Sequence, residues 1–195
     1  MTHARGLLLV HCDPEPTLEE ELNAWYDTEH LPERAAIAGF ETALRFTSLG
    51  DGPRYLAIYD LADLDVLESP AYRAVSGLNF SPWTKRVTSR ARPVRLTARQ
   101  VETQAGTVAC TRLLLLQFDA TSKDAAAIEA GLEASFGSHP GLLQCRLFEG
   151  IEPAQDFMLA ICGFAGPDIP ALDMGSFGTL AGRLTLAARY RPYRR

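Results

Sequence analysis

Short runs of hydrophobic residues, separated by polar or turn-forming segments, predict the elements of this chain. The run Gly6–His11 is typical of a strand, and Thr17 with Glu20 three residues later is a capping box that predicts the start of a helix. Pro32 disfavours helical geometry at Leu31, so we expect this helix to end or kink near His30. The elements predicted for the first half are a strand at 6–11, a helix at 17–30, strands at 40–49 and 55–61, a helix at 63–75 and a strand at 86–100.

The same order of elements recurs after residue 106. The elements predicted there are a strand at 107–118, a helix at 122–136, strands at 142–148 and 157–164, at most a short helix at 176–181, and a strand at 184–190. The tripeptide at 56–58, Leu-Ala-Ile, also recurs at 159–161. The pattern predicts an α+β protein made of two tandem ferredoxin-like βαββαβ repeats, one at 1–100 and a degenerate one at 107–195.

This predicted architecture leaves one face of each four-stranded sheet uncovered. Two such sheets within one chain can pack face to face and enclose an apolar space. Concave apolar spaces with a few polar groups are the usual ligand sites of proteins. We therefore expect a pocket for a small-molecule ligand between the two sheets.

The segment at 25–33 contains the densest set of chemically useful side chains. His30 is the candidate for proton transfer, because an ordinary imidazole pKa of about 6.5 allows it to gain and lose protons at neutral pH. Tyr26 lies four residues earlier on the same helix face and could orient the imidazole or a ligand oxygen. Trp25 is a candidate platform for a ligand or a core residue, and His30 could instead cap backbone carbonyls at the helix end.

A second set of candidate ligand-binding residues is largely aromatic. Tyr55 and Tyr59 share one face of a predicted strand, because side chains of a strand alternate between its faces. Phe80 and Trp83 are expected in a loop, and Arg45 could anchor an anion or lie exposed on the surface. Four histidines without ligand spacing, and cysteines without a Cys-x-x-Cys pair, predict no metal site.

The first half resembles the dimeric α+β barrel superfamily, which includes EthD-type proteins, antibiotic-biosynthesis monooxygenases and small stress-response barrels. The residues that carry the resemblance are Trp25-Tyr26, His30-Leu-Pro32, Gly39-Phe40, Arg45 and the strand at 55–61. The resemblance implies that the two repeats pack as an intramolecular dimeric α+β barrel. Because the helix predicted at 122–136 contains neither Trp nor His, we expect one site per chain.

The resemblance also implies a class of function. Members of the superfamily bind small, often aromatic or polyketide-like molecules, and several catalyse oxygenation, isomerisation or cyclisation without a metal or a tight organic cofactor. The expected function is therefore that of a monooxygenase, isomerase or cyclase that acts on a small aromatic or polyketide-like compound and needs no cofactor. The alternative is a non-catalytic ligand-binding or stress-response barrel. A haem held by His30 stays open, because some members bind haem.

Composition narrows the partners of the chain. With 19 Lys and Arg against 24 Asp and Glu, the net charge is -5, which argues against a nucleic-acid partner. The one basic cluster, at 189–195, is interpreted as a solvated tail. No apolar run approaches the roughly 20 residues of a membrane span, so we expect no membrane partner. Cys145 and Cys162, inside apolar runs, are predicted to be buried free thiols of a cytoplasmic protein. Two such chains could associate as a homodimer of pseudo-dimers.

Overall fold

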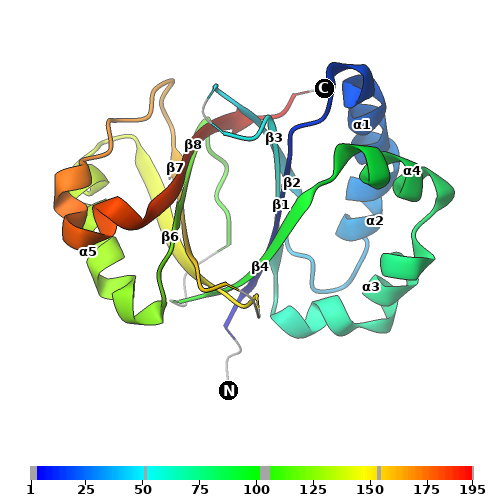
Figure 1. The fold of residues 1–195 in the computed structure, drawn as a ribbon, viewed down its shortest axis with the longest axis horizontal. Coiled ribbons are helices and arrows are strands. Elements are labelled where there is room, and N and C mark those ends of the chain that lie inside the picture. The colour runs from blue at the N-terminus through cyan, green and yellow to red at the C-terminus, as the bar shows by residue number, and fades with distance from the viewer. Residues whose placement is uncertain (1–3, 51, 102–105, 153–154, 195) are drawn as a thin grey trace.

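The computed structural model describes residues 4–50, 52–101, 106–152 and 155–194. Within these ranges, eight antiparallel strands close into one barrel (Figure 1). The strands are β1 (Gly6–Cys12), β2 (Leu44–Ser48), β3 (Tyr55–Leu61), β4 (Val94–Gln100), β5 (Arg112–Phe118), β6 (Leu142–Gly150), β7 (Met158–Phe164) and β8 (Leu184–Pro192). The helical segments are η1 (Pro16–Leu18), α1 (Glu19–Trp25), η2 (Tyr26–His30), α2 (Leu31–Ala35), η3 (Leu64–Glu68), α3 (Pro70–Ala74), η4 (Gly77–Asn79), α4 (Pro82–Ala91), η5 (Ser122–Asp124), α5 (Ala125–Phe136) and η6 (Met174–Arg183).

The order of strands around the barrel is β1-β3-β2-β8-β5-β7-β6-β4. Each half of the chain contributes four neighbouring strands, with its first and third strands in the centre and its second and fourth strands outside. Pairing of β2 with β8 and of β4 with β6 joins the two halves into one sheet. The predicted α+β barrel is thus confirmed. The tandem-repeat origin of the halves and the boundaries at 100 and 107 stay predictions.

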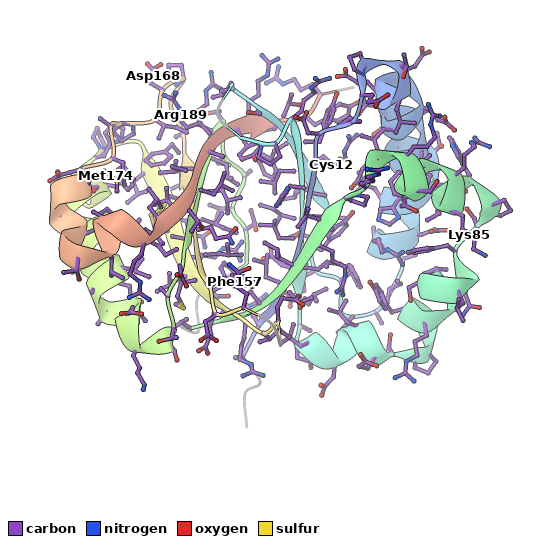
Figure 2. The ribbon with its side chains drawn as sticks, viewed as in Figure 1. Cys12, Lys85, Phe157, Asp168, Met174 and Arg189 are labelled. Carbon is purple, nitrogen blue, oxygen red and sulfur yellow. A yellow bond between two sulfur atoms is a disulfide. The ribbon has the colours of Figure 1, made fainter. Side chains whose placement is uncertain are left out.

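The helices cover the barrel on two opposite sides. Helices α1 to α4 lie against the first-half strands, while α5 and η6 lie against the second-half strands (Figure 1). Inside the barrel, apolar side chains such as Leu7, Leu9, Ile58 and Phe157 form a continuous core (Figure 2). Side chains of the described residues therefore fill much of the space in which the ligand pocket was expected.

Strand β3 shows how the alternation of side chains separates the two faces of the sheet. Leu56 and Ile58 belong to the barrel core, whereas Tyr55 and Tyr59 pack outward against the helices. The shared face predicted for the two tyrosines is confirmed. Asp60 has the parity of the core residues and is 1% exposed, so it requires a partner inside the barrel.

The long strand expected at 86–100 is wrong for its first part. Residues 82–91 form helix α4, whose buried residues Thr84, Val87 and Ala91 recur at helical spacing. Ser81 caps this helix by accepting a hydrogen bond from the Thr84 N–H at 2.9 Å. Arg92, with φ of 47°, ends the helix in the left-handed region, and β4 follows. Trp83 therefore lies on a helix and not in the predicted loop.

The prediction of two free thiols at 145 and 162 is also wrong. Cys145 on β6 lies directly opposite Cys162 on β7, and the two form a disulfide. The cause is the hairpin register, which pairs the two residues across neighbouring strands. Cys12 and Cys110 are free. The cysteines therefore give no support to the reducing compartment inferred from the sequence.

Candidate functional site

The candidate site is built on the helix that begins at Glu19 and continues to Ala35. Pro32 led us to expect that the helix ends or kinks near His30. The helix does not end there, but it departs from regular α-helical geometry in the π-helical turn η2. The Leu31 N–H donates to the carbonyl of Tyr26, five residues earlier. Pro32 has no N–H to donate to the preceding turn, so a wider turn can precede it without losing a further hydrogen bond. Such turns often lie at functional sites.

His30 lies at the end of this turn, within a cluster of aromatic rings. Its imidazole stacks on Trp25 at 4.3 Å between ring centroids and meets the edges of Tyr26 and Tyr59 at 5.3 and 6.3 Å. The Nδ1 atom is buried and has no hydrogen-bond partner among the described residues. Burial, with the positive charges of Arg34 and Arg45 nearby, lowers the pKa of His30 to about 3. The imidazole is therefore neutral at physiological pH.

A chain of hydrogen bonds fixes Trp25 beside His30. The indole Nε1–H donates to the Thr84 hydroxyl at 3.0 Å, and this hydroxyl donates to Glu29 at 2.8 Å. Glu29 also accepts a hydrogen bond from Ser81 at 2.6 Å. Burial acts to raise the pKa of Glu29, but these hydrogen bonds outweigh it and the pKa is lowered. Trp25 and Glu29 thus connect the π-helical turn to helix α4.

Arg45 is the centre of the second cluster. Its guanidinium carbon lies 4.1 Å from the ring centroids of both Tyr26 and Tyr193, in a double cation–π contact. Its Nη2 donates to the Asn23 side-chain oxygen at 2.7 Å. Its Nη1 is 3.7 Å from an oxygen of Asp27, which is an ion pair but too long for a hydrogen bond. Arg45 is 6% exposed, so the exposed arginine considered as an alternative is not found.

The side chain of Tyr55 supports this arginine from strand β3. Its hydroxyl accepts a hydrogen bond from the Asn23 amide at 3.1 Å and donates one to Glu19. The Tyr55 ring lies 5.2 Å from the Arg45 guanidinium carbon and 6.3 Å from the Tyr193 ring. Arg45 is therefore held in one position by neighbours from helix α1, strand β3 and the segment after β8.

A cavity of about 450 Å³ opens beside Arg45. Asp27 and Leu31 line it from the helix, Arg45 from β2, Cys110 from the segment before β5, and Tyr193 from the segment after β8. Burial raises the pKa of the Cys110 thiol, so the thiol stays protonated. The cavity thus combines an apolar wall with one cation and one carboxylate. We call it the Arg45 cavity.

The structure gathers most of the predicted site residues in two adjoining clusters. Trp25, Tyr26, His30 and Tyr59 form the first cluster, and Tyr26 connects it to Arg45 and Tyr55 in the second. Of the predicted site residues, Arg45 lines the Arg45 cavity. The residues Trp25, Tyr55, Tyr59, Phe80, which follows η4, and Trp83, on α4, do not. Neither His30 nor Tyr26 lines it, and their catalytic roles stay predictions.

Three residues with polar side-chain atoms that line the Arg45 cavity escaped the sequence analysis. Asp27 stands inside the segment at 25–33, where its carboxylate was a visible signal between Tyr26 and His30. Cys110 and Tyr193 come from segments that have no motif of their own. Only the closing of the barrel, which pairs β8 with β2, brings Tyr193 to Arg45.

A haem does not fit at His30. A histidine that ligates haem iron needs open space in front of a ring nitrogen, since the porphyrin is a broad plane. Here Trp25 covers one face of the imidazole, and the rings of Tyr26 and Tyr59 stand edge-on to it. His30 lines neither the Arg45 cavity nor three other cavities formed by described residues.

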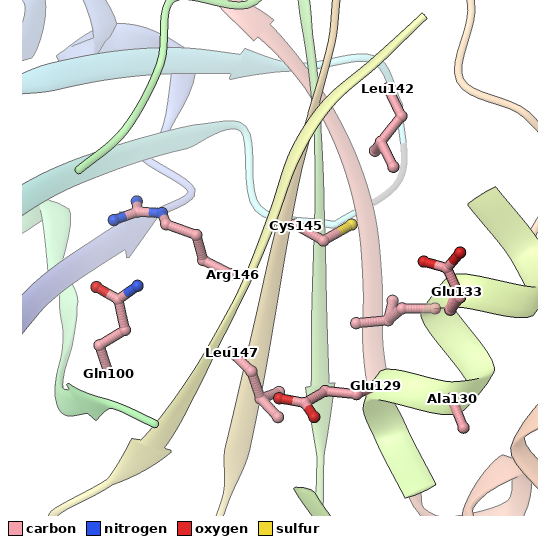
Figure 3. Close-up of a pocket in the computed structure, with 9 residues that line it drawn as sticks. Gln100, Glu129, Ala130, Glu133, Leu142, Cys145, Arg146 and Leu147 are labelled. Atoms are coloured by element: carbon pink, nitrogen blue, oxygen red, sulfur yellow. The ribbon is translucent and has the colours of Figure 1, made fainter. Parts of the chain in front are cut away.

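A further cavity, of about 360 Å³, lies between helix α5 and strand β6. Figure 3 shows Cys145 and Leu147 on the side of β6 that faces Glu129 and Glu133, with Gln100 and Arg146 on the other side. Both amide atoms of Gln100 are buried without a partner among the described residues. Because Gln100 and Arg146 lie across the strand from Glu129 and Glu133, the polar groups of this cavity do not converge on one point.

The described part of the chain contains no group of three or more His, Cys, Asp or Glu side chains arranged to hold a metal ion. Over the same residues, no helix has the length and apolar character needed to cross a membrane.

Comparison with known proteins supports the fold. No protein-family model and no curated protein sequence matches this chain. An anthrone oxidase-like protein superposes with a TM-score of 0.66 at 12% identity, covering 98% of this chain and 92% of that protein. A candidate monooxygenase from Lactobacillus acidophilus gives 0.59 at 10% identity, covering 98% and 94%, and a candidate chlorite dismutase gives 0.57 at 10%, covering 98% and 96%. These proteins and the closed eight-stranded barrel show that this chain has the fold of the dimeric α+β barrel superfamily, as its first half predicted.

Proposed function

We propose that this chain is an enzyme that oxygenates a small aromatic or polyketide-like compound without an organic cofactor. The observation that carries the proposal is the Arg45 cavity, where a buried guanidinium and a carboxylate face one apolar space. The names of two structural neighbours, anthrone oxidase-like and monooxygenase, support oxygen chemistry. Monooxygenase is thus favoured over the isomerase and cyclase that the resemblance also allowed.

The substrate would be a planar compound with an acidic C–H next to a carbonyl or a phenol. The Asp27 carboxylate accepts the proton from carbon, and Arg45 stabilises the negative charge that then develops on the oxygen of the enolate. The electron-rich carbon of this enolate reacts with dioxygen, which is the second substrate. The resulting peroxide anion takes the proton back from Asp27. The hydroperoxide then loses water, using a second hydrogen on the same carbon, so one oxygen atom becomes the new carbonyl of the product and the other leaves as water.

The unpaired N–H of Arg45 makes this role physically reasonable. Its Nη1 has no hydrogen-bond partner among the described residues, and the only ion-pair contact found for this atom, with Asp27, is 3.7 Å long. A ligand oxyanion would complete that donor, and charge-assisted hydrogen bonds of this kind are about twice as strong as neutral ones. Rings of Tyr26 and Tyr193 hold the guanidinium in place, so little reorganisation is needed.

Asp27 is a better proton acceptor than His30 in this geometry. Asp27 lines the Arg45 cavity, whereas the imidazole of His30 lies in the aromatic cluster with Trp25 and with Tyr59 of β3. In this proposal His30 positions the π-helical turn from which Asp27 extends.

The proposal is tested with anthrone as the probe, by following oxygen uptake and product absorbance. We expect the wild type to accelerate oxygen uptake, Asp27→Asn to lower kcat by about 10²–10⁴-fold, and Arg45→Met to raise KM or lower kcat by roughly tenfold or more. Arg73→Met, at an exposed ion pair on α3, is the control and should change neither. Equal activity in wild type and Asp27→Asn would refute the mechanism.

The non-catalytic alternative predicts a different result. A ligand-binding or stress-response barrel would bind anthrone, measured by quenching of tryptophan fluorescence, without any oxygen uptake above the buffer rate. The identity of the halves as tandem repeats and the association of two chains into a homodimer are part of the same proposal. Sedimentation of the purified chain would decide the latter.

A further inference from the structure

A second cavity adjoins the Arg45 cavity and has a different character. It measures about 630 Å³ and lies at the end of β8, beside the start of β5 and the segment that follows β7. The two cavities share Cys110, Pro192 and Tyr193 as a common wall. The charged residues that line it are all arginines: Arg112, Arg191 and Arg194.

None of these three arginines has an ion pair among the described residues. Arg112 donates one hydrogen bond, to the carbonyl of the neighbouring Thr111 at 2.8 Å. No described carboxylate lines the cavity, although the chain as a whole has a net charge of -5. An excess of unpaired positive charge at one place in an acidic protein is the electrostatic signature of an anion site.

The strand register brings two of these charges together. Leu113 of β5 pairs with Tyr190 of β8, so Arg112 and Arg191 follow at neighbouring positions of the two strands. Leu113 and Tyr190 point into the barrel core. Arg112, just before Leu113, and Arg191, just after Tyr190, therefore point outward on the same face of the sheet. Like charges opposite each other destabilise a sheet, unless an anion lies between them.

We propose that this cavity binds a phosphate or carboxylate group of a small molecule, through Arg112, Arg191 and Arg194. The planar guanidinium groups match the paired oxygens of either anion. The anion site stands on its own observations. Placing the anion on the same ligand as the aromatic part rests on the proposed function, and the shared wall at Tyr193 makes one ligand of two parts the simplest occupant.

The basic cluster at 189–195, of which Arg195 lies outside the described residues, is thereby divided. Arg191 and Arg194 line the cavity, whereas Arg189 lies outside it, earlier on β8 (Figure 2). Arg189 has an outward position on the same strand as Arg191, which makes it a matched control. Arg191 and Arg194 are exposed to solvent, as the sequence analysis expected, and they also line a cavity.

The test is calorimetric titration of the full chain with inorganic pyrophosphate and, separately, with citrate. We expect one site per chain, with the tighter of the two probes identifying the phosphate or the carboxylate source. The variant Arg191→Gln/Arg194→Gln should weaken the affinity for that probe by about tenfold or more, while Arg189→Gln should leave it within about twofold. Thermal melts of both variants confirm that they are folded.

Three results would overturn the anion site: no binding of either probe to the wild type at millimolar concentration, equal loss of affinity in Arg189→Gln, or unchanged affinity in the double variant. Arg45→Met distinguishes this inference from the proposed function. It should retain binding of pyrophosphate or citrate even if it, and the wild type, show no oxygen uptake with anthrone. Loss of probe binding in Arg45→Met would contradict a separate anion site.

Discussion

Replacing Asp60 by asparagine tests the one buried ion pair that crosses the barrel among the described residues. Asp60 of β3 and Arg146 of β6 are 1% and 2% exposed, and their closest atoms, Oδ1 and Nη1, are 2.6 Å apart. Asp60 also accepts hydrogen bonds from the Thr42 hydroxyl at 2.8 Å and the Thr107 N–H at 2.9 Å. The asparagine side chain would retain the shape and one oxygen but leave Arg146 without a counter-charge.

The size of the effect follows from this burial. At an effective dielectric constant of about 20, charges 2.6 Å apart attract by roughly 6 kcal/mol, most of which the cost of removing both from water offsets. The variant keeps that cost for the arginine and loses the attraction. We expect Asp60→Asn to lower the free energy of unfolding by about 3–5 kcal/mol, and Asp60→Asn/Arg146→Met to recover a large part of the loss.

Urea unfolding monitored by circular dichroism measures these free energies. The pH dependence provides an independent check. Burial acts to raise the pKa of Asp60, but attraction to Arg146 and hydrogen bonds from Thr107 and Arg146 lower it overall. The pair therefore stabilises the fold at pH values above the unfolded carboxyl pKa of about 3.9, and this contribution is lost as the pH falls through the lower folded value. A loss below about 1 kcal/mol in Asp60→Asn, or a double variant no more stable than the single, would refute the reasoning.

Two further predictions concern side chains outside the barrel interior. Titration of the denatured, unreduced chain with a thiol reagent should detect thiols at two of the four cysteines, and four reactive thiols before reduction would contradict the disulfide. Cys145→Ser should lower the free energy of unfolding by about 2–4 kcal/mol. The folded imidazole of His30, with a pKa of about 3, resists the proton that the unfolded imidazole accepts, so the wild type should lose stability as the pH falls from 6.5 to about 3. His30→Phe should keep the stacking on Trp25 but not show this loss. Parallel pH profiles of the urea midpoints of both proteins would contradict this.

The fold was predictable because each half carries its own hydrophobic pattern. The strands at 6–11 and 55–61 and the helix at 122–136 follow from local periodicity, and the structure places them within a few residues. The strand expected at 86–100 is wrong in its first part, because the alternation of its second part concealed the helical spacing of Val87 and Ala91 with Thr84 before them.

The site was predictable only in part, for a physical reason. Trp25, Tyr26 and His30 come from one helix, so their proximity follows from local geometry. Arg45 and Tyr193 are brought together by closure of the barrel between β2 and β8, which no local pattern encodes. The same closure places Arg191 and Arg112 beside a cavity, and their charges in the sequence carried no sign of it.

The pairing of β2 with β8 has a consequence for the order of events during synthesis. Residues 46 and 192 are partners, so the barrel stays open until nearly all of the described chain has left the ribosome. Tyr193, Arg191 and Arg194 arrive with that last strand, and both proposed binding cavities need them. A nascent or truncated chain that lacks this strand would contain the helix with Trp25, Tyr26 and His30 but would have no ligand affinity. Ligand binding would therefore show that the barrel has closed.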